Sequence, residues 1–137
     1  MDNLIYETLV GTEIRLLKVC PGEIGDPINC EIKRIPLDTD PKYIALSYVW
    51  GGNSTKYKID INNRDFSIGE NLYFAIDQLR HYNKKFVRYF VWIDAICINQ
   101  NDTAEKSKQV GRMLEIYARA HSTIAWLGRP EPVDEPY

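Results

Sequence analysis

The sequence contains few of the residues on which metal binding and nucleophilic catalysis depend. Its 137 residues include three cysteines and two histidines. Cys20, Cys30 and Cys97 form no C-x-x-C pair, and neither His81 nor His121 lies beside a plausible serine elbow. A zinc site and a histidine-based triad both need several such side chains at matched spacing. We therefore predict no metal centre.

Long apolar runs and an excess of basic charge are also missing. No apolar run approaches the roughly 20 residues that span a bilayer, and the amino terminus has no basic segment followed by an apolar one. The net charge is −2 and the basic residues are scattered, which gives no electrostatic case for nucleic acid. An odd number of cysteines fits poorly with a disulfide framework, and a reducing cytosol favours free thiols. The alternative is a bridge between Cys20 and Cys30 across a hairpin. These features predict a cytoplasmic domain that binds neither membrane nor nucleic acid.

Two antiparallel hairpins are predicted from alternating apolar and polar residues. Residues 13–19 and 29–35 flank a loop rich in proline and glycine. Residues 57–61 and 65–68 flank an Asn-Asn pair, which favours a tight turn. Both hairpins are expected as additions to a central sheet.

The core of that sheet is predicted from three apolar segments, 43–50, 88–98 and 122–127. Helical periodicity at 70–82 and about 103–120 places a helix between successive segments. This order implies parallel strands joined by right-handed crossovers, and so an α/β fold. The stripe that we expect the second helix to bury consists of Val110, Met113, Leu114, Tyr117 and Ala120.

Polar and aromatic residues gather where the first two core strands are predicted to end. Open α/β sheets bind ligands beyond the carboxyl ends of their strands, so we predict a ligand-binding site there. Its candidate residues are Ser47, Tyr48, Trp50 and Gly51 in one segment, and Asp94, Asn99 and Gln100 in the other. The alternative is architectural, with aromatic side chains packed in the core and the glycine, Asn99 and Gln100 forming turns.

Asp94 and Glu105 are the candidate acids for catalysis, although no catalytic set is defined. Asp94 lies within a predicted apolar strand, where a carboxylate is costly unless it is paired or solvated at a cleft. Its alternative role is to accept hydrogen bonds from loop amides. Asp102 and Glu105 fit a D-x-x-E capping box, in which each side chain bonds the backbone of the other residue. That cap accounts for Glu105 without catalysis.

Two segments closely resemble the fungal heterokaryon incompatibility (HET) domain. They are Y-I-A-L-S-Y-V-W-G at 43–51 and V-W-I-D-A-I-C-I-N-Q at 91–100. The leading strand, both helices and the Trp126-Leu127-Gly128 segment also agree with the family, in the same order. The resemblance covers roughly residues 6–128, and several motifs in register make it specific.

The resemblance implies a role in fungal non-self recognition, in which incompatible hyphal fusion triggers programmed cell death. The family is considered distantly similar to Toll/interleukin-1 receptor (TIR) domains, which implies a three-layer, flavodoxin-like core. Some TIR domains hydrolyse NAD with a glutamate on the helix after the third strand. The resemblance therefore implies a signalling and interaction module, with an NAD-hydrolysing or nucleotide-binding domain as the alternative.

Members of the family commonly continue beyond the Trp-Leu-Gly strand, into a segment that has room for such a glutamate. This sequence ends at Tyr137. We therefore expect a HET domain over residues 1–128 that is incomplete at its carboxyl end, followed by a flexible tail rich in proline and acid at 129–137. A sheet that ends at its third parallel strand has an exposed edge, which predicts self-association or binding of partner proteins.

Overall fold

The computed structural model describes residues 5–49 and 57–128. Within them, seven strands form one mixed sheet in the order β5-β4-β2-β1-β6-β3-β7. The strands are β1 (Glu13–Val19), β2 (Asn29–Pro36), β3 (Tyr43–Tyr48), β4 (Tyr57–Ile61), β5 (Arg64–Ile68), β6 (Phe90–Trp92) and β7 (Ser122–Trp126). The helices are α1 (Glu70–Tyr82), α2 (Lys84–Arg88), α3 (Asp94–Cys97), α4 (Thr103–Gly111) and α5 (Met113–Arg119), with a short 3-10 turn at Leu37–Thr39. The predicted α/β class is confirmed.

Both predicted hairpins are present and lie side by side in the sheet. β1 and β2 pair antiparallel from Glu13 opposite Pro36 to Val19 opposite Cys30. β4 and β5 pair antiparallel, and β4 also joins β2 in parallel. The β4–β5 turn needs two residues with positive φ, which Asn62 and Asn63 supply at 53° and 66°.

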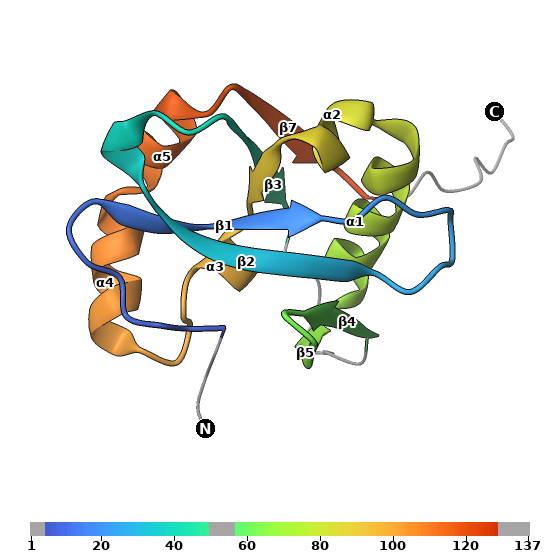
Figure 1. Cartoon of the computed structure of the whole chain (residues 1–137), viewed down its shortest axis with the longest axis horizontal. Coiled ribbons are helices and arrows are strands. Elements are labelled where there is room, and N and C mark those ends of the chain that lie inside the picture. The colour runs from blue at the N-terminus through green and yellow to red at the C-terminus, as the bar shows by residue number, and fades with distance from the viewer. Residues whose placement is uncertain (1–4, 50–56, 129–137) are drawn as a thin grey trace, which may run out of the picture.

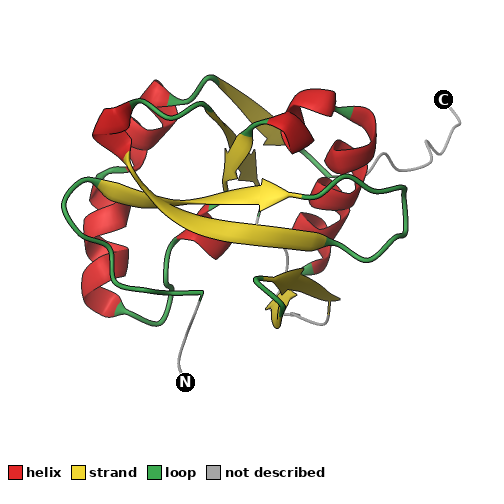
Figure 2. Cartoon of the chain, viewed as in Figure 1, coloured by secondary structure: helices red, strands yellow, loops and turns green. Residues whose placement is uncertain are grey.

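The three predicted parallel strands are confirmed as β6, β3 and β7, with β3 in the middle. Ala45 of β3 lies opposite Trp92, and Tyr48 lies opposite Trp126. The helices gather in two groups that stand apart, α1 with α2 and α4 with α5 (Figure 1). The strands run between these groups (Figure 2). β1 joins the first hairpin to the parallel strands by pairing antiparallel with β6.

The prediction of one strand over residues 88–98 is wrong. Only Phe90–Trp92 is extended, and it lies between the short helices α2 and α3. Six apolar residues of this stretch, at positions 91–93 and 96–98, are at most 1% exposed. Because a buried segment is apolar whatever its backbone conformation, the unbroken run concealed these changes of structure.

The predicted second long helix is broken at Arg112, where φ is −100° and ψ is 0°. Its buried face is also rotated from the predicted stripe. Val110 is 51% exposed and Leu114 is 85% exposed, whereas Gln109 and Ile116 are buried. Met113, Tyr117 and Ala120 pack against the core as expected. The Arg112 guanidinium donates to the carbonyls of Thr12, just before β1, and of Glu13, its first residue, and this anchor helps to set the buried face.

The three cysteines are free thiols, as expected. Cys20 is exposed, while Cys30 and Cys97 are buried. Burial is the main cause that raises the pKa of both buried thiols to about 12. Cys30 and Cys97 are therefore protonated at neutral pH and act as small apolar core residues.

Candidate functional site

The carboxyl ends of β3 and β6 carry a cluster of polar and aromatic residues. Ser47 and Tyr48 end β3, and Asp94 follows β6 after a single residue. Parallel neighbours bring their carboxyl ends to the same edge of the sheet. The prediction that Asp94 lies inside a strand is wrong. Asp94 lies in the first turn of α3, where it is half-buried. This position removes the cost that a carboxylate within a buried strand would carry.

The negative charge of Asp94 helps to raise the pKa values of two tyrosine hydroxyls in this cluster. Burial, and after it the negative charge of Asp94, raises the pKa of Tyr48 above its usual value. The same two causes raise the pKa of Tyr117 on α5, and a hydrogen bond with Ser47 partly offsets them. Both phenols therefore stay protonated at neutral pH, so the cluster combines a carboxylate with neutral hydroxyl donors.

Two aromatic side chains, Trp92 and Tyr117, pack together at this cluster. The rings of Trp92 and Tyr117 meet edge to face, with centroids 5.5 Å apart. Trp92 is 0% exposed, and its indole nitrogen has no hydrogen-bond partner among the described residues. Sequence reasoning missed both residues as parts of the site because each one reads as core. One signal in the sequence could have identified Tyr117 as a site residue. It carries a polar hydroxyl on a helix face that is predicted to be buried.

The remaining predicted site residues have different places. Gln100 reaches the cluster, because its side-chain amide donates to the backbone carbonyl of Asp94 at 2.9 Å. The side-chain oxygen of Asn99 instead accepts from the Asn101 amide at 3.2 Å, which makes it a turn former. Trp50 and Gly51 lie outside the described residues.

Glu105 has a different function from the one that the capping box predicts. Asp102 does accept from the Glu105 amide, at 3.1 Å. The Glu105 carboxylate does not reach back to Asp102 in the described contacts. It accepts from the Asn99 amide at 2.8 Å and from both terminal nitrogens of Arg15, one of them at 2.9 Å. Glu105 therefore joins α4, the loop before it and β1 through one buried ion pair.

Arg15 is the centre of this second polar group, and sequence reasoning missed it. It is 1% exposed on β1, and its guanidinium also donates to the carbonyls of Glu7 and Cys97. Its guanidinium carbon lies 4.9 Å from the centre of the Tyr6 ring. Tyr6 in turn donates to the Ile96 carbonyl at 2.7 Å. These contacts fasten the amino-terminal segment over β1 and α3.

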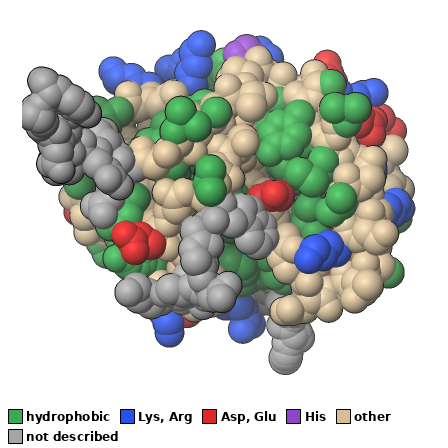
Figure 3. Space-filling model, turned by 180° about the vertical axis from the view of Figure 1, so that it is seen from behind, with side chains coloured by type: hydrophobic (Ala, Val, Ile, Leu, Met, Phe, Trp, Pro, Cys, Tyr) green, Lys and Arg blue, Asp and Glu red, His purple; other side chains and the backbone are tan. Residues whose placement is uncertain are grey.

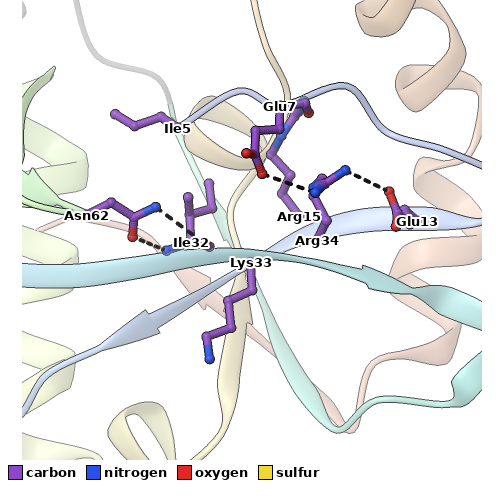
Figure 4. A pocket seen from close by; sticks show the side chains of 8 residues that line it. All are labelled: Ile5, Glu7, Glu13, Arg15, Ile32, Lys33, Arg34 and Asn62. Atoms are coloured by element: carbon purple, nitrogen blue, oxygen red, sulfur yellow. Dashed lines mark hydrogen bonds and ion pairs between the residues drawn. The ribbon is translucent and has the colours of Figure 1, made fainter. Parts of the chain in front are cut away.

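A pocket of about 280 Å³ lies where this amino-terminal segment crosses β1 and β2 (Figure 4). Its lining consists of Ile5, Glu7, Glu13, Arg15, Ile32, Lys33, Arg34 and Asn62. Arg34 bridges Glu7 at 3.1 Å and Glu13 at 3.8 Å, while the Lys33 side chain points to the other side of β2 (Figure 4). The charges of Arg34, Glu7 and Glu13 are paired with one another, so this pocket lies where parts of the fold pack together. The cluster at the carboxyl ends of β3 and β6 is the better site candidate.

Two further findings concern the described parts of the chain. Within residues 5–49 and 57–128, no group of three His, Cys, Asp or Glu side chains is placed to hold a metal ion. None of the helices in these ranges is long and apolar enough to cross a membrane.

The fold and the cluster define a mixed α/β domain with polar and aromatic groups at the carboxyl edge of its parallel strands. Comparison with known proteins gives its class. The family described as "Heterokaryon incompatibility protein (HET)" matches residues 43–136. The chain therefore belongs to the heterokaryon incompatibility (HET) family, as its motifs indicated.

One relative in this family is the Neurospora crassa protein named "Heterokaryon incompatibility protein 6, OR allele". It is 38% identical over an alignment 128 residues long, and the alignment covers 85% of this chain. The same alignment covers only 19% of the relative, so this chain spans less than a fifth of that protein. No solved structure matches the chain.

Proposed function

We propose that this chain is a signalling and interaction module of fungal heterokaryon incompatibility. Its assembly with itself or with partner proteins in the cytoplasm triggers programmed cell death after incompatible hyphal fusion. The family match carries the proposal, together with the incompatibility function in the name of the Neurospora relative. In this proposal the domain acts through the surfaces it presents.

The arrangement of acidic groups supports a module more than an enzyme. Of the two candidate acids, Glu105 has its carboxylate engaged by Arg15 and the Asn99 amide. Asp94 stands beside phenols that keep their protons at neutral pH. Large apolar side chains are meanwhile available for contacts, since Val49 is 63% exposed and Leu127 is 87% exposed.

Overexpression of this chain in a fungal host is expected to force its assembly, and so to arrest growth and kill hyphal compartments. Vital-dye staining, with immunoblots that confirm the soluble protein, would measure the effect. Arg15→Met should abolish killing because it removes a buried partner on which the fold depends, whereas Arg34→Met at a half-exposed pair should preserve it. Normal growth of hyphae that contain the folded, unaltered chain would contradict the proposal.

The carboxyl-edge cluster supports a second candidate, a TIR-like domain that binds or hydrolyses NAD. In this candidate the parallel strands β6, β3 and β7, with the helices that join them, form a three-layer, flavodoxin-like core. Ser47, Tyr48, Asp94 and Tyr117 then line the ligand site, with Tyr48 and Tyr117 as hydrogen-bond donors.

An NAD turnover assay on the purified chain distinguishes the two candidates. The module proposal expects no release of nicotinamide above the rate without protein. The enzyme candidate expects release that Asp94→Ala lowers by about 100-fold or more. Asp65→Ala, at an exposed position on β5, is the matched control and should leave any turnover unchanged. Circular dichroism must show that each variant is folded.

A further inference from the structure

The outer edge of β7 is open in the described structure. β7 is the last strand of the sheet, and within residues 5–49 and 57–128 it pairs only with β3. Parallel strands are normally covered on both faces. In β7, by contrast, Ser122, Thr123 and Ala125 are exposed, and only Ile124 and Trp126 are half-buried. β7 is therefore a terminal strand with one unpaired edge and largely uncovered side chains in the described structure.

The two edge strands of the sheet, β5 and β7, differ in the residues they carry. Natural sheets protect an edge strand with charged side chains, prolines or bulges, because an open edge pairs with other strands. β5, at the far edge, carries the exposed charges Arg64 and Asp65. β7 carries neither charge nor proline. Within residues 5–49 and 57–128, β5 therefore carries features that protect an edge strand and β7 does not.

Exposed apolar side chains lie just beyond the carboxyl ends of β7 and β3. Leu127 follows β7 at 87% exposure, and Val49 follows its neighbour β3 at 63%. β7 lies at the back of the molecule in Figure 1, and the opposite view shows several hydrophobic side chains among polar and charged ones on that face (Figure 3). A partner strand that pairs with β7 would therefore also cover exposed apolar side chains.

We propose that β7 of a second copy of this chain pairs antiparallel with this edge, across a two-fold axis. Centred on Ile124, such pairing places Ile124 against its own copy and Thr123 against Ala125. Ser122 then faces Trp126. The strand is complementary to itself, because an apolar residue meets an apolar one and no charge opposes a like charge. The pairing joins two sheets into one continuous sheet.

The short strand limits the strength of this dimer. Five residues on each side, with two apolar neighbours, provide a small interface. Interfaces at the low end of the size range are weak, so we expect a dissociation constant of roughly micromolar or weaker. This inference names the self-association surface of the proposed module. It rests on that function for its biological role, but not for the pairing itself.

Paired substitutions at Thr123 and Ala125 test the dimer, since both positions are exposed and face each other across the proposed axis. Thr123→Lys with Ala125→Lys sets lysine against lysine and should weaken dimerisation by about tenfold or more. Thr123→Lys with Ala125→Glu sets lysine against glutamate and should restore it. Ser67→Lys, on the exposed face of β5, is the control and should change nothing.

Sedimentation equilibrium over a wide concentration series measures each constant. A chain that stays monomeric throughout, or equal constants for the two double variants, would overturn the proposal. Cell-death assays of the same variants keep the two proposals separate. If the double-lysine variant is monomeric and still kills, the proposed surface exists but does not act in signalling. If the unaltered chain dimerises but never kills, the function proposed above fails and the dimer stands.

Discussion

Replacing Arg15 by methionine is expected to lower the free energy of unfolding by about 3–5 kcal/mol. Arg15 is 1% exposed, and its partner Glu105 has a side chain only 12% exposed. The substitution leaves that carboxylate without a compensating charge, and it also removes the donor to the carbonyls of Glu7 and Cys97. Urea unfolding followed by tryptophan fluorescence measures the loss as a lower midpoint at an unchanged slope.

Arg34 provides a matched control, because it lies directly opposite Arg15 in the β1–β2 ladder. Its side chain is 37% exposed and pairs with Glu7 and Glu13 at the surface. Arg34→Met should cost about 1 kcal/mol or less, as exposed ion pairs do. Equal losses for the two arginines would contradict the view that the buried Arg15 pair matters more.

A double substitution separates the unpaired charge from other effects of losing Arg15. Arg15→Met with Glu105→Leu removes both charges, so no carboxylate is left buried without a partner. Such replacements of buried ion pairs are often close to neutral. We expect the double variant to regain a large part of the stability that Arg15→Met loses. If it is as unstable as the single variant, the loss comes from the carbonyl contacts.

Local sequence patterns predicted the elements whose structure is decided locally. The helical periodicity of α1 gave its bounds, Glu70–Tyr82, because its apolar positions recur at one spacing. The β4–β5 turn followed from Asn62 and Asn63, which tolerate positive φ. The parallel direction of β6, β3 and β7 followed from the alternation of strands and helices, whereas their order in the sheet did not.

Distant polar contacts decided what the sequence could not predict. Arg15 and Glu105 are 90 positions apart, and within β1 the arginine reads as an exposed residue between apolar ones. The same pair turns Glu105 inward on α4, and Gln109, one turn later, is buried as well. These polar residues share the inward face, so the apolar Val110 and Leu114 lie toward solvent. Periodicity alone assigns the apolar side of the helix to the core, so it does not predict that Glu105 and Gln109 face inward.

The candidate site was predictable where it follows from topology. Ser47, Tyr48 and Asp94 lie at the shared carboxyl edge because their strands are parallel neighbours. Tyr117 comes from a helix more than twenty positions later in the sequence, so only the packed structure places it against Ser47. Whether a ligand binds there stays a prediction.

A second arginine, Arg80, fastens the long β1–β2 loop to α1. Its guanidinium donates to the carbonyls of Pro27 at 2.8 Å, Glu23 at 3.0 Å and Asp26. It also pairs with Asp77 at 2.9 Å, where the two side chains are 1% and 5% exposed. The loop backbone packs so closely here that a Cβ atom on Gly22 would lie 2.6 Å from a guanidinium nitrogen of Arg80. The loop is therefore shaped around this side chain.

Arg80→Met is expected to cost about 3–5 kcal/mol of stability, because it leaves Asp77 buried without its charge partner. The effect should also be local. The Gly25 amide donates to both carboxylate oxygens of Asp77 at 3.3 Å, so its hydrogen exchange should accelerate more than that of β3 amides. Arg119→Met is the control, since Arg119 also binds a backbone carbonyl and an acid but is 45% exposed, and it should cost about 1 kcal/mol or less. Unchanged exchange at Gly25 in Arg80→Met would show that the loop is held by other contacts.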